Sequence, residues 1–411
     1  MQILFIHQNF PGQFKHLAPA LVAQGHQVFA LSTRQDLPST WEGVSLLSYQ
    51  PKRSSTPNLH PWLIDFETKT IRAEAVFHRA KQLQAQGLNP DLILSNPGWG
   101  ESLLVKDVWP RAKLAIYCEF FYHAKGYDLD FDPEFDSKDV DSAARIRWKN
   151  LNHFLHFDIA DAGIAPTHWQ AASFPEPFRS RITVVHDGID TDLLAPNPQA
   201  DLIFANQMVL NRQDEIITFV NRNLEPYRGY HSFMRSLPAI LERRPQAKVL
   251  IVGGDEVSYG ARPKGNQSWR DIFLQEIQPK LSQEAFQRIF FLGRIPYNFF
   301  IPLLQISTVH VYLSYPFVLS WSLLEAMSCG CAIAASDTEA IKEVITHNQT
   351  GQLVNFFDYA AIADTVCHLL ENPQERQRLG QNARHHIQQN YDLKTICLPK
   401  QLQWIEQLLA S

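Results

Sequence analysis

The chain has 411 residues, with 37 Lys and Arg against 42 Asp and Glu and a formal net charge of −5. Hydrophobic residues make up 45% and charged residues 19%, an ordinary globular composition that excludes a disordered or fibrous chain. The length predicts two core-forming domains. The mild negative charge, without a long basic run, argues against general nucleic-acid binding.

The five cysteines are scattered, and the first residues read as a strand rather than as a signal peptide. We therefore expect a reducing, cytoplasmic location. No charged side chain occurs between Arg294 and Glu325, a stretch long enough to cross a membrane, but prolines and polar side chains interrupt it. This stretch predicts a buried helix, then a buried strand, then a loop.

Short apolar runs predict the strands in chain order. In the first half they lie at 2–6, 27–31, 91–95, 113–119 and 182–185, with a helix over 14–21 after the first strand, and in the second half at 216–221, 248–253, 289–292, 309–313 and 332–335. Apolar strands that alternate with helices indicate parallel sheets covered on both faces. The fold class is therefore α/β, with two Rossmann-like doubly wound domains at 1–195 and 200–389.

Two arginines follow the first strand of the second half. Ligands of such sheets bind beyond the carboxyl ends of the strands, and Arg222 and Arg228 are placed there. A guanidinium keeps its charge and can donate to two phosphate oxygens, and a helix that starts near Gly229 would add its positive end. The alternative is a solvated loop in which the arginines pair with Glu225 or Asp255.

A single carboxylate stands in the long apolar stretch. Glu325 falls in the first turns of the predicted buried helix, and a buried carboxylate requires hydrogen-bond donors. Ribose hydroxyls would satisfy it, and so would a buried partner or the helix dipole.

These segments resemble the retaining nucleotide-sugar glycosyltransferases of family 4, which have the GT-B fold. The resemblance is carried by Arg222 with Arg228, by 323–330 around Glu325, and by 186–191 before a proline-containing linker at 195–198. It implies two domains that face a cleft, with the acceptor on the first and the nucleotide sugar on the second. It also implies that a terminal helix at about 390–411 packs back on the first domain.

The resemblance also implies residue roles. Arg222 and Arg228 would hold the donor diphosphate, and Glu325 the ribose. The other donor-binding residues would be Ser320, Trp321 and Ser322, through backbone N–H groups near the phosphate and sugar, and Gly293, Arg294 and Ile295 near the base. Gly12, after the first strand, would let the backbone approach the transferred sugar or its phosphate. An ordinary turn after Pro11 is the alternative.

The sequence departs from the family pattern at two places. Phe317 stands where the family usually has a second glutamate that touches the sugar. Either the sugar is held differently, or the enzyme belongs to a branch with an altered donor pocket, or activity is lost, and we rank the divergent branch first. Many members place a histidine after the strand at 113–118. Here Glu119 and His123 are the catalytic candidates, and a buried paired carboxylate and an ordinary loop histidine are the alternatives.

Asn96 and Trp99 follow another strand of the first half and are candidates for acceptor binding. An aromatic ring suits the apolar face of a sugar, although a core tryptophan is an equal alternative. The histidines show no metal-ligand spacing, and Cys329 and Cys331 have no partner cluster. We therefore expect no metal and no cofactor besides the nucleotide-sugar co-substrate.

The resulting hypothesis is a retaining glycosyltransferase that moves a sugar from a UDP- or GDP-sugar to the hydroxyl of a sugar, a lipid-linked or a small-molecule acceptor. Such a reaction belongs to glycan, glycolipid or glycoside biosynthesis. A catalytically silent nucleotide-sugar-binding protein and a GT-B epimerase are the alternatives. Basic residues such as Lys52 and Arg53 permit a weak peripheral membrane contact, with a solvated face as the alternative.

Overall fold

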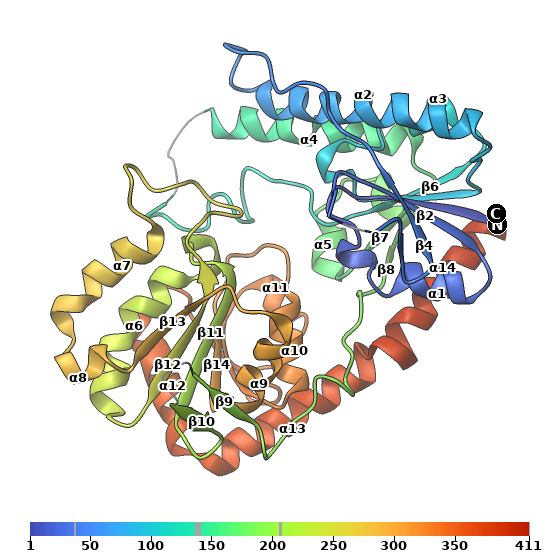
Figure 1. Ribbon diagram of the computed structural model, residues 1–411. Helices are drawn as coiled ribbons and strands as arrows, with labels where there is room; N and C mark the ends of the chain where they lie inside the picture. Colours follow the sequence, from blue (N-terminus) through green and yellow to red (C-terminus); the bar gives the residue numbers. More distant parts are fainter. Residues whose placement is uncertain (37, 136–140, 205–207, 411) are drawn as a thin grey trace. The chain divides into compact units, whose positions relative to one another are not determined.

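The computed structural model describes residues 1–36, 38–135, 141–204 and 208–410. It divides into two compact units (Figure 1). Unit 1 comprises Met1–Asp130, Asp136–Gly188 and Lys394–Ser411, and unit 2 comprises Phe131–Phe135 and Ile189–Leu393. Ser411, the last residue of the expected terminal helix, lies outside the described residues, as do 205–207 of the expected second domain.

The sheet of unit 1 has the strand order β3-β4-β2-β1-β5-β6-β7-β8. All neighbouring pairs are parallel except β3 and β4. The strands are β1 (Gln2–Ile6), β2 (Gln27–Ser32), β3 (Thr40–Trp41), β4 (Val44–Ser48), β5 (Leu92–Ser95), β6 (Lys113–Tyr117), β7 (Ala162–Ala165) and β8 (Ile182–Val184). Because the order runs outward from β1 in both directions, the topological switch point lies between β1 and β5.

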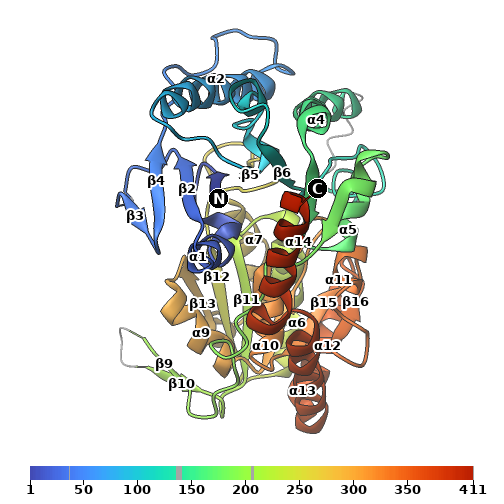
Figure 2. The ribbon, with the colours of Figure 1, turned by 90° about the vertical axis from the view of Figure 1, so that its right-hand side faces the viewer.

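Alternate residues of β1 build the two faces of this sheet. Ile3 and Phe5 belong to the core that contains α1 and α14, whereas Leu4 and Ile6 belong to the core that contains α2, α3 and α5. The terminal helix α14 lies beside α1 (Figure 2). The helices are α1 (Leu17–Ala23), α2 (Ile64–Ala85), α3 (Val105–Val108), α4 (Ser142–Ile159), α5 (His168–Ala172) and α14 (Leu398–Ala410).

Unit 2 has a parallel sheet of strand order β13-β12-β11-β14-β15-β16. Its strands are β11 (Ile216–Asn223), β12 (Lys248–Gly254), β13 (Ile289–Gly293), β14 (Val309–Tyr312), β15 (Ala332–Ser336) and β16 (Gln352–Val354), and β9 (Asp201–Ile203) pairs separately with β10 (Val209–Asn211). The switch point lies between β11 and β14.

Helices cover both faces of the unit 2 sheet. One core contains α6, α7 and α12, and the other contains α9, α10 and α13. The helices are α6 (Tyr230–Arg243), α7 (Trp269–Ile277), α8 (Gln283–Phe286), α9 (Tyr297–Ile306), α10 (Trp321–Ser328), α11 (Glu339–Lys342), α12 (Tyr359–Glu371) and α13 (Pro373–Asn390).

The uncharged stretch between Arg294 and Glu325 forms α9, β14, a loop and the start of α10, which confirms the predicted order of buried helix, buried strand and loop. No helix in the described ranges combines the length and the hydrophobicity needed to cross a bilayer. The helix expected over 14–21 was wrong at its start, because Phe14 ends the 3₁₀ turn η1 (Gly12–Phe14) and α1 begins only at Leu17.

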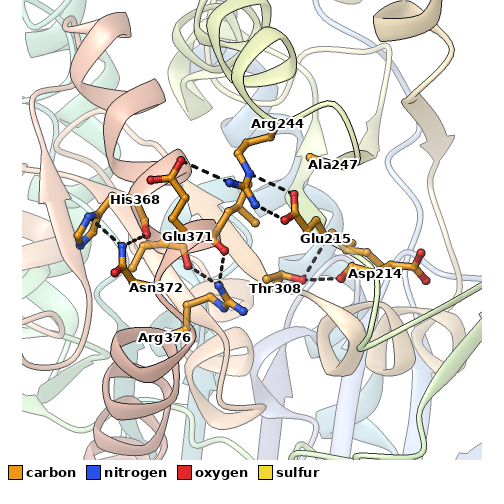
Figure 3. A network of polar contacts seen from close by, with 12 residues as sticks. Asp214, Glu215, Arg244, Ala247, Thr308, His368, Glu371, Asn372 and Arg376 are labelled. Carbon is orange, nitrogen blue, oxygen red and sulfur yellow. Dashed lines mark hydrogen bonds and ion pairs between the residues drawn. The ribbon is translucent and has the colours of Figure 1, made fainter.

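A polar network joins the amino ends of β11 and β14 to α6 and α12 (Figure 3). Arg244 directly follows α6 and donates to both oxygens of Glu215, which precedes β11, and to Glu371 at the end of α12. Thr308, which precedes β14, donates to the carbonyl oxygen of Asp214. These contacts link the amino ends of the two central strands, which lie opposite to the carboxyl ends where ligands of such sheets bind.

We expect Arg244→Ala to lower the free energy of unfolding of unit 2 by about 1–2 kcal/mol, because charge-assisted hydrogen bonds of a mostly buried guanidinium are lost. For a unit of this size that corresponds to a melting-temperature decrease of a few degrees, about 2–4 °C per kcal/mol. The matched control is Arg243→Ala, whose side chain is 43% exposed and pairs with Asp364. Equal destabilisation by both variants in thermal unfolding would contradict the prediction.

Candidate functional site

The central side chain of the candidate site is Arg228. It ends the short 3₁₀ turn η4 (Pro226–Arg228), which follows β11, and Gly229 caps α6 with a positive φ of 67°. A side chain at position 229 would place its Cβ 2.2 Å from Leu313, so only glycine fits between the turn and the loop after β14. Arg228 thus lies at the switch point between β11 and β14.

Arg228 is buried, with 5% of its surface exposed. Its Nη1 atom donates to Ser314 Oγ at 2.9 Å, to the carbonyl oxygen of Val318 at 2.9 Å and to Tyr312 Oη at 3.4 Å. All three acceptors belong to β14 or to the loop after it. Arg228 therefore joins the carboxyl ends of the two central strands.

Arg228 is a buried charge whose hydrogen bonds go to neutral groups. Burial lowers its pKa, but the nearby oxygens of Tyr312 and Tyr259 and the charge of Glu225 raise the pKa above its usual value. Among the described residues no carboxylate lies within ion-pair distance of Arg228. An unpaired buried charge is costly, so an anionic ligand is the partner that this arrangement favours.

The alternative pairing with Glu225 or Asp255 is wrong in the structure. Glu225 is fully buried and accepts hydrogen bonds from three successive backbone N–H groups, those of Ser258, Tyr259 and Gly260, at 3.0–3.2 Å. Asp255 pairs with Arg270 at 3.2 Å. Glu225 therefore fixes the loop after β12 instead of neutralising Arg228.

The other arginine has a different environment. Arg222 is exposed near the end of β11, so the two predicted diphosphate ligands differ sharply in burial. The neighbouring Asn223 is buried, and its Oδ1 atom accepts from Arg294 Nη2 at 3.0 Å. Arg294 also pairs with Glu256 at 2.7 Å. Arg294 and Ile295 follow Gly293, which ends β13 with a φ of 64°.

Glu325 lies in the second turn of α10 and is 7% exposed. Its Oε1 atom accepts a hydrogen bond from Tyr297 Oη at 2.8 Å, and Tyr297 begins α9. Burial and the charge of Glu325 together raise the pKa of Tyr297, so the phenol remains protonated and donates. Sequence reasoning missed Tyr297, whose only signal was its place four residues after Gly293.

The backbone N–H groups at the start of α10 already have internal partners. Ser320 caps the helix, its N–H donates to Tyr312 Oη at 3.1 Å, and its Oγ accepts from the N–H of Ser322 at 3.4 Å. Trp321 is the first residue of the helix. Ser320 and Ser322 would have to exchange these bonds in order to bind a phosphate or a sugar.

Phe317 is buried beside the guanidinium of Arg228. It is 3% exposed, and its ring meets Tyr227 edge-on with centroids 5.3 Å apart and Tyr259 at 5.1 Å. The guanidinium carbon of Arg228 lies 4.9 Å from the Tyr259 ring and 5.8 Å from the Phe317 ring. The replacement of the usual glutamate by Phe317 therefore places an aromatic ring near the guanidinium of Arg228.

In unit 1 the candidate residues meet at the switch point between β1 and β5. His7 follows β1, and its ring lies edge-on to Trp99, with centroids 4.8 Å apart. Trp99 ends the turn η2 (Pro97–Trp99) after β5 and is half-buried. Burial lowers the pKa of His7 to about 4. His7 is therefore a neighbour of the candidate site. From the sequence, the histidines were considered only as possible metal ligands, so this position was missed.

Gly12 has a reason of its own to be glycine. Its φ is 48°, and a Cβ there would lie 2.5 Å from the ring of His7. The local packing therefore requires glycine at this position, independently of any approach to a sugar.

The three remaining predicted residues lie near the carboxyl ends of β5 and β6. Asn96 is buried and donates to Glu119 Oε2 at 3.4 Å, so these two side chains are neighbours. His123 bonds the carbonyl oxygen of Ser173 through Nε2 at 2.7 Å and stacks on Tyr127 with centroids 4.1 Å apart. The structure thus brings Asn96 and Glu119 together and holds His123 in a separate packed position.

The five cysteines, all within the described residues, are buried and form no disulfide bond. In the described parts of the chain, no group of three or more His, Cys, Asp or Glu side chains could hold a metal ion.

Comparison with known proteins gives matches in both halves of the chain. Residues 24–194 match the model of the Glycosyl transferase family 4 group, and residues 203–386 match the model of Glycosyl transferases group 1. D-inositol 3-phosphate glycosyltransferases of Corynebacterium efficiens and Kribbella flavida are 27% and 26% identical over 209 and 214 residues, 50% and 51% of this chain. The matched regions cover 46% and 47% of those proteins, so the chain spans about half the length of the curated relatives it matches.

Solved structures resemble the whole fold. Sucrose-phosphate synthase of Thermosynechococcus elongatus superimposes with a TM-score of 0.75 at 19% identity, covering 100% of both chains. HepE of Anabaena, solved with UDP-glucose, superimposes with a TM-score of 0.69 at 16% identity, covering 99% of this chain and 100% of that one. These likenesses confirm the α/β fold with two Rossmann-like domains. The two adjoining family matches, together with this fold, show that the chain belongs to the family 4 glycosyltransferases of GT-B fold.

Proposed function

We propose that the protein is a retaining glycosyltransferase that moves a sugar from a nucleoside diphosphate sugar to an acceptor hydroxyl. The observation that carries this proposal is Arg228, a buried guanidinium at the switch point of unit 2 whose hydrogen-bond partners are neutral. A diphosphate is the anion that matches such a group in a fold of this family.

The chemistry requires stabilisation of a leaving group. When the glycosidic bond breaks, negative charge develops on the diphosphate, and a fixed cation in a dry site lowers the barrier to that step. Arg228 supplies this charge, and the exposed Arg222 adds a second one. We propose that the transfer is metal-independent, with the arginines in place of a divalent ion, and that attack and departure occur on the same face of the sugar.

Glu325 is the proposed ligand of the donor ribose. A carboxylate can accept several hydrogen bonds, so Glu325 can accept from ribose hydroxyls as well as from Tyr297. A UDP- or GDP-sugar donor agrees with two similar proteins: HepE, solved with UDP-glucose, and a GDP-mannose-dependent mannosyltransferase of Corynebacterium glutamicum that is 23% identical over 224 residues.

Unit 1 provides the proposed acceptor site. Trp99 offers a half-buried ring for a sugar acceptor, and Asn96 and Glu119 form a polar pair at the carboxyl ends of β5 and β6. Glu119, which lies beside Asn96, and His123, which bonds the carbonyl oxygen of Ser173, are the two proposed candidates for the group near the reacting carbon. A sugar, a lipid-linked sugar or a small molecule would be the acceptor.

Calorimetric titration of the purified protein with UDP, GDP, ADP and inorganic pyrophosphate tests the donor site. We expect one nucleoside diphosphate to bind selectively. Glu325→Ala should weaken that nucleotide about 10-fold or more, because a charge-assisted pair of hydrogen bonds to the ribose is lost, and should leave pyrophosphate affinity unchanged. Equal loss of both ligands would contradict the ribose role, and a wild-type protein that binds none of them would contradict the donor site.

Phe317 favours a second candidate function, a nucleotide-sugar-binding protein without catalysis. Its buried aromatic ring cannot supply a hydrogen bond to a donor sugar. Donor binding without hydrolysis or transfer, over a broad panel of sugar, lipid-linked and small-molecule acceptors, would favour this candidate. Sugar transfer to any of them would exclude it.

A further inference from the structure

A five-residue segment, Phe131–Phe135, belongs to unit 2, although the chain on both sides of it belongs to unit 1. We call this segment the strap. Its two aromatic residues pack against the core of α6, α7 and α12. Phe131 contacts Tyr315, Phe356 and Phe357 with ring centroids 5.0–5.2 Å apart, and Phe135 contacts His231 and Trp269 at 5.0 and 5.3 Å. The packing of Phe131 and Phe135 against this core therefore holds the strap in place.

The strap carries a buried carboxylate. Asp132 is 3% exposed, and its Oδ2 atom accepts a hydrogen bond from Tyr315 Oη at 2.7 Å and lies 3.1 Å from His231 Nε2. Burial raises the pKa of Asp132, but the hydrogen bonds from His231 and Tyr315 outweigh burial and hold the pKa below its usual value. The bond to Tyr315 is thus charge-assisted and dry, which makes it one of the stronger kinds of hydrogen bond.

Tyr315 leads directly to the donor site. It lies between Ser314 and Val318, the two residues whose oxygens accept from Arg228 at 2.9 Å. Its backbone N–H donates to the carbonyl oxygen of Tyr227, the residue before Arg228, and the two tyrosine rings lie 4.7 Å apart. Fixing the phenol of Tyr315 therefore fixes the loop that orients the buried guanidinium.

We propose that Asp132 is a positioning residue for donor binding, which acts through Tyr315 on the loop that holds Arg228. This inference rests on the proposed function of Arg228 as the diphosphate ligand. Asp132 touches neither substrate nor reacting atoms in this role. A segment of unit 2 that is distant in sequence from the rest of that unit thus sets the geometry of its nucleotide site.

The test compares Asp132→Ala, Tyr315→Phe and the double variant with a control on the same strap. The control is Glu134→Gln, because the Glu134 side chain makes a bidentate pair with Arg235, whereas the Tyr315 hydroxyl donates to Asp132. Nucleotide affinity is measured by calorimetry under conditions in which every variant is folded, as checked by circular dichroism. Hydrogen exchange of Leu313–Ser320 is measured on the ligand-free proteins.

We expect each single variant to weaken nucleotide binding about 10-fold, the change for one charge-assisted hydrogen bond. The double variant should be no weaker than the worse single variant, because both remove the same bond. Both should also speed exchange in Leu313–Ser320, whereas Glu134→Gln should change neither quantity. A merely structural role would lower the denaturation midpoint without altering the dissociation constant of the folded protein.

The inference is overturned if affinity is unchanged in the folded single variants, if the two losses add fully, or if Glu134→Gln has the same effect. A wild-type protein that binds no nucleotide overturns the proposed donor site instead. In that case the exchange rates still decide whether Asp132 orders the loop, and unchanged rates overturn that part of the inference independently.

Discussion

Arg228→Met is expected to reduce kcat/KM for sugar transfer about 1,000-fold and to weaken nucleoside diphosphate binding about 100-fold. Removal of one preorganised donor to a developing oxyanion costs about 10²–10³ in rate, and loss of charge-assisted hydrogen bonds to a buried ligand adds to it. Donor affinity by calorimetry and transfer rates with saturating donor measure the two effects separately.

The same variant is expected to unfold at a temperature close to that of the wild type. The side chain loses hydrogen bonds to Ser314 and Val318, but the folded state no longer pays for a buried charge paired only with neutral groups. Undiminished stability together with lost binding is the pattern of a functional residue rather than a structural one. A large fall in melting temperature without loss of affinity in the folded protein would contradict the assignment.

Arg222→Met is the matched control on the same segment. Its guanidinium is exposed at the end of β11, so its attraction for the diphosphate is screened by water and salt. We expect a loss of at most about 10-fold in affinity, which diminishes further at high ionic strength. If Arg222→Met weakens nucleoside diphosphate binding as much as Arg228→Met or more, burial of the arginine does not explain its contribution to donor binding.

Unit 1 is expected to unfold near pH 5 while unit 2 remains folded. Burial lowers the pKa of four unit 1 histidines far below the value of about 6.5 in an unfolded chain: His7, His156 and His186 to about 4, and His153 to about 3. As the pH falls below about 6.5, the unfolded chain binds protons that the folded unit does not, so stability is lost. At pH 5 each of these histidines lowers the free energy of unfolding of unit 1 by about 2 kcal/mol, and the four together lower it by about 8 kcal/mol.

Glu101 acts with the opposite sign. Burial raises its pKa to about 8, so the folded unit holds a proton between pH 8 and about 4.5 that the unfolded chain releases. Acidification from pH 7.5 to pH 5 therefore increases the free energy of unfolding of unit 1 by about 3 kcal/mol through Glu101. The net loss for unit 1 is about 5 kcal/mol, comparable with the whole stability of a domain. In unit 2, burial lowers the pKa of His310 to about 3 and also lowers the pKa of His386.

Hydrogen exchange of each unit as a function of pH tests this difference. Glu101→Gln should make the loss of unit 1 stability on acidification steeper, because the compensating proton is removed. His153→Phe should make the loss of unit 1 stability on acidification less steep, because the unfolded chain then binds one proton fewer. The phenylalanine ring should be tolerated because it would lie among Phe121, Phe157 and Phe174. Parallel unfolding of both units, or equal slopes in both variants, would contradict the prediction.

The strongly apolar strands were predictable because they carry their signal locally. β1, β11, β12 and β14 were expected within a few residues of their bounds, since strands buried on both faces read as short continuous apolar runs. β7 was missed because Ala162–Ala165 is small and short, with only Ile164 as a typical strand residue. Its register between β6 and β8 is decided by packing, not by its own composition.

The candidate site was predictable as residue types but not as environments. The sequence predicted that Arg222 and Arg228 both follow a strand, which is wrong for Arg222, because β11 extends to Asn223 and includes it. Nothing local distinguishes the exposed arginine from the buried one. The role of Glu225 was also hidden, because its three N–H partners lie more than 30 residues away in the loop after β12. Pairings at such separations depend on the order of strands in the sheet.

The sequence alone determined the α/β class, two parallel sheets in series, the membership in a glycosyltransferase family and the segment that carries the donor arginines. These features are encoded in local hydrophobic patterns and in short motifs whose residues are close in the chain. Only the tertiary structure decided that Arg228 lacks a carboxylate partner among the described residues, that Tyr297 holds Glu325, and that the strap brings Asp132 to Tyr315. These contacts join residues from different strands and loops, and their energies depend on burial, which exists only once the chain has folded.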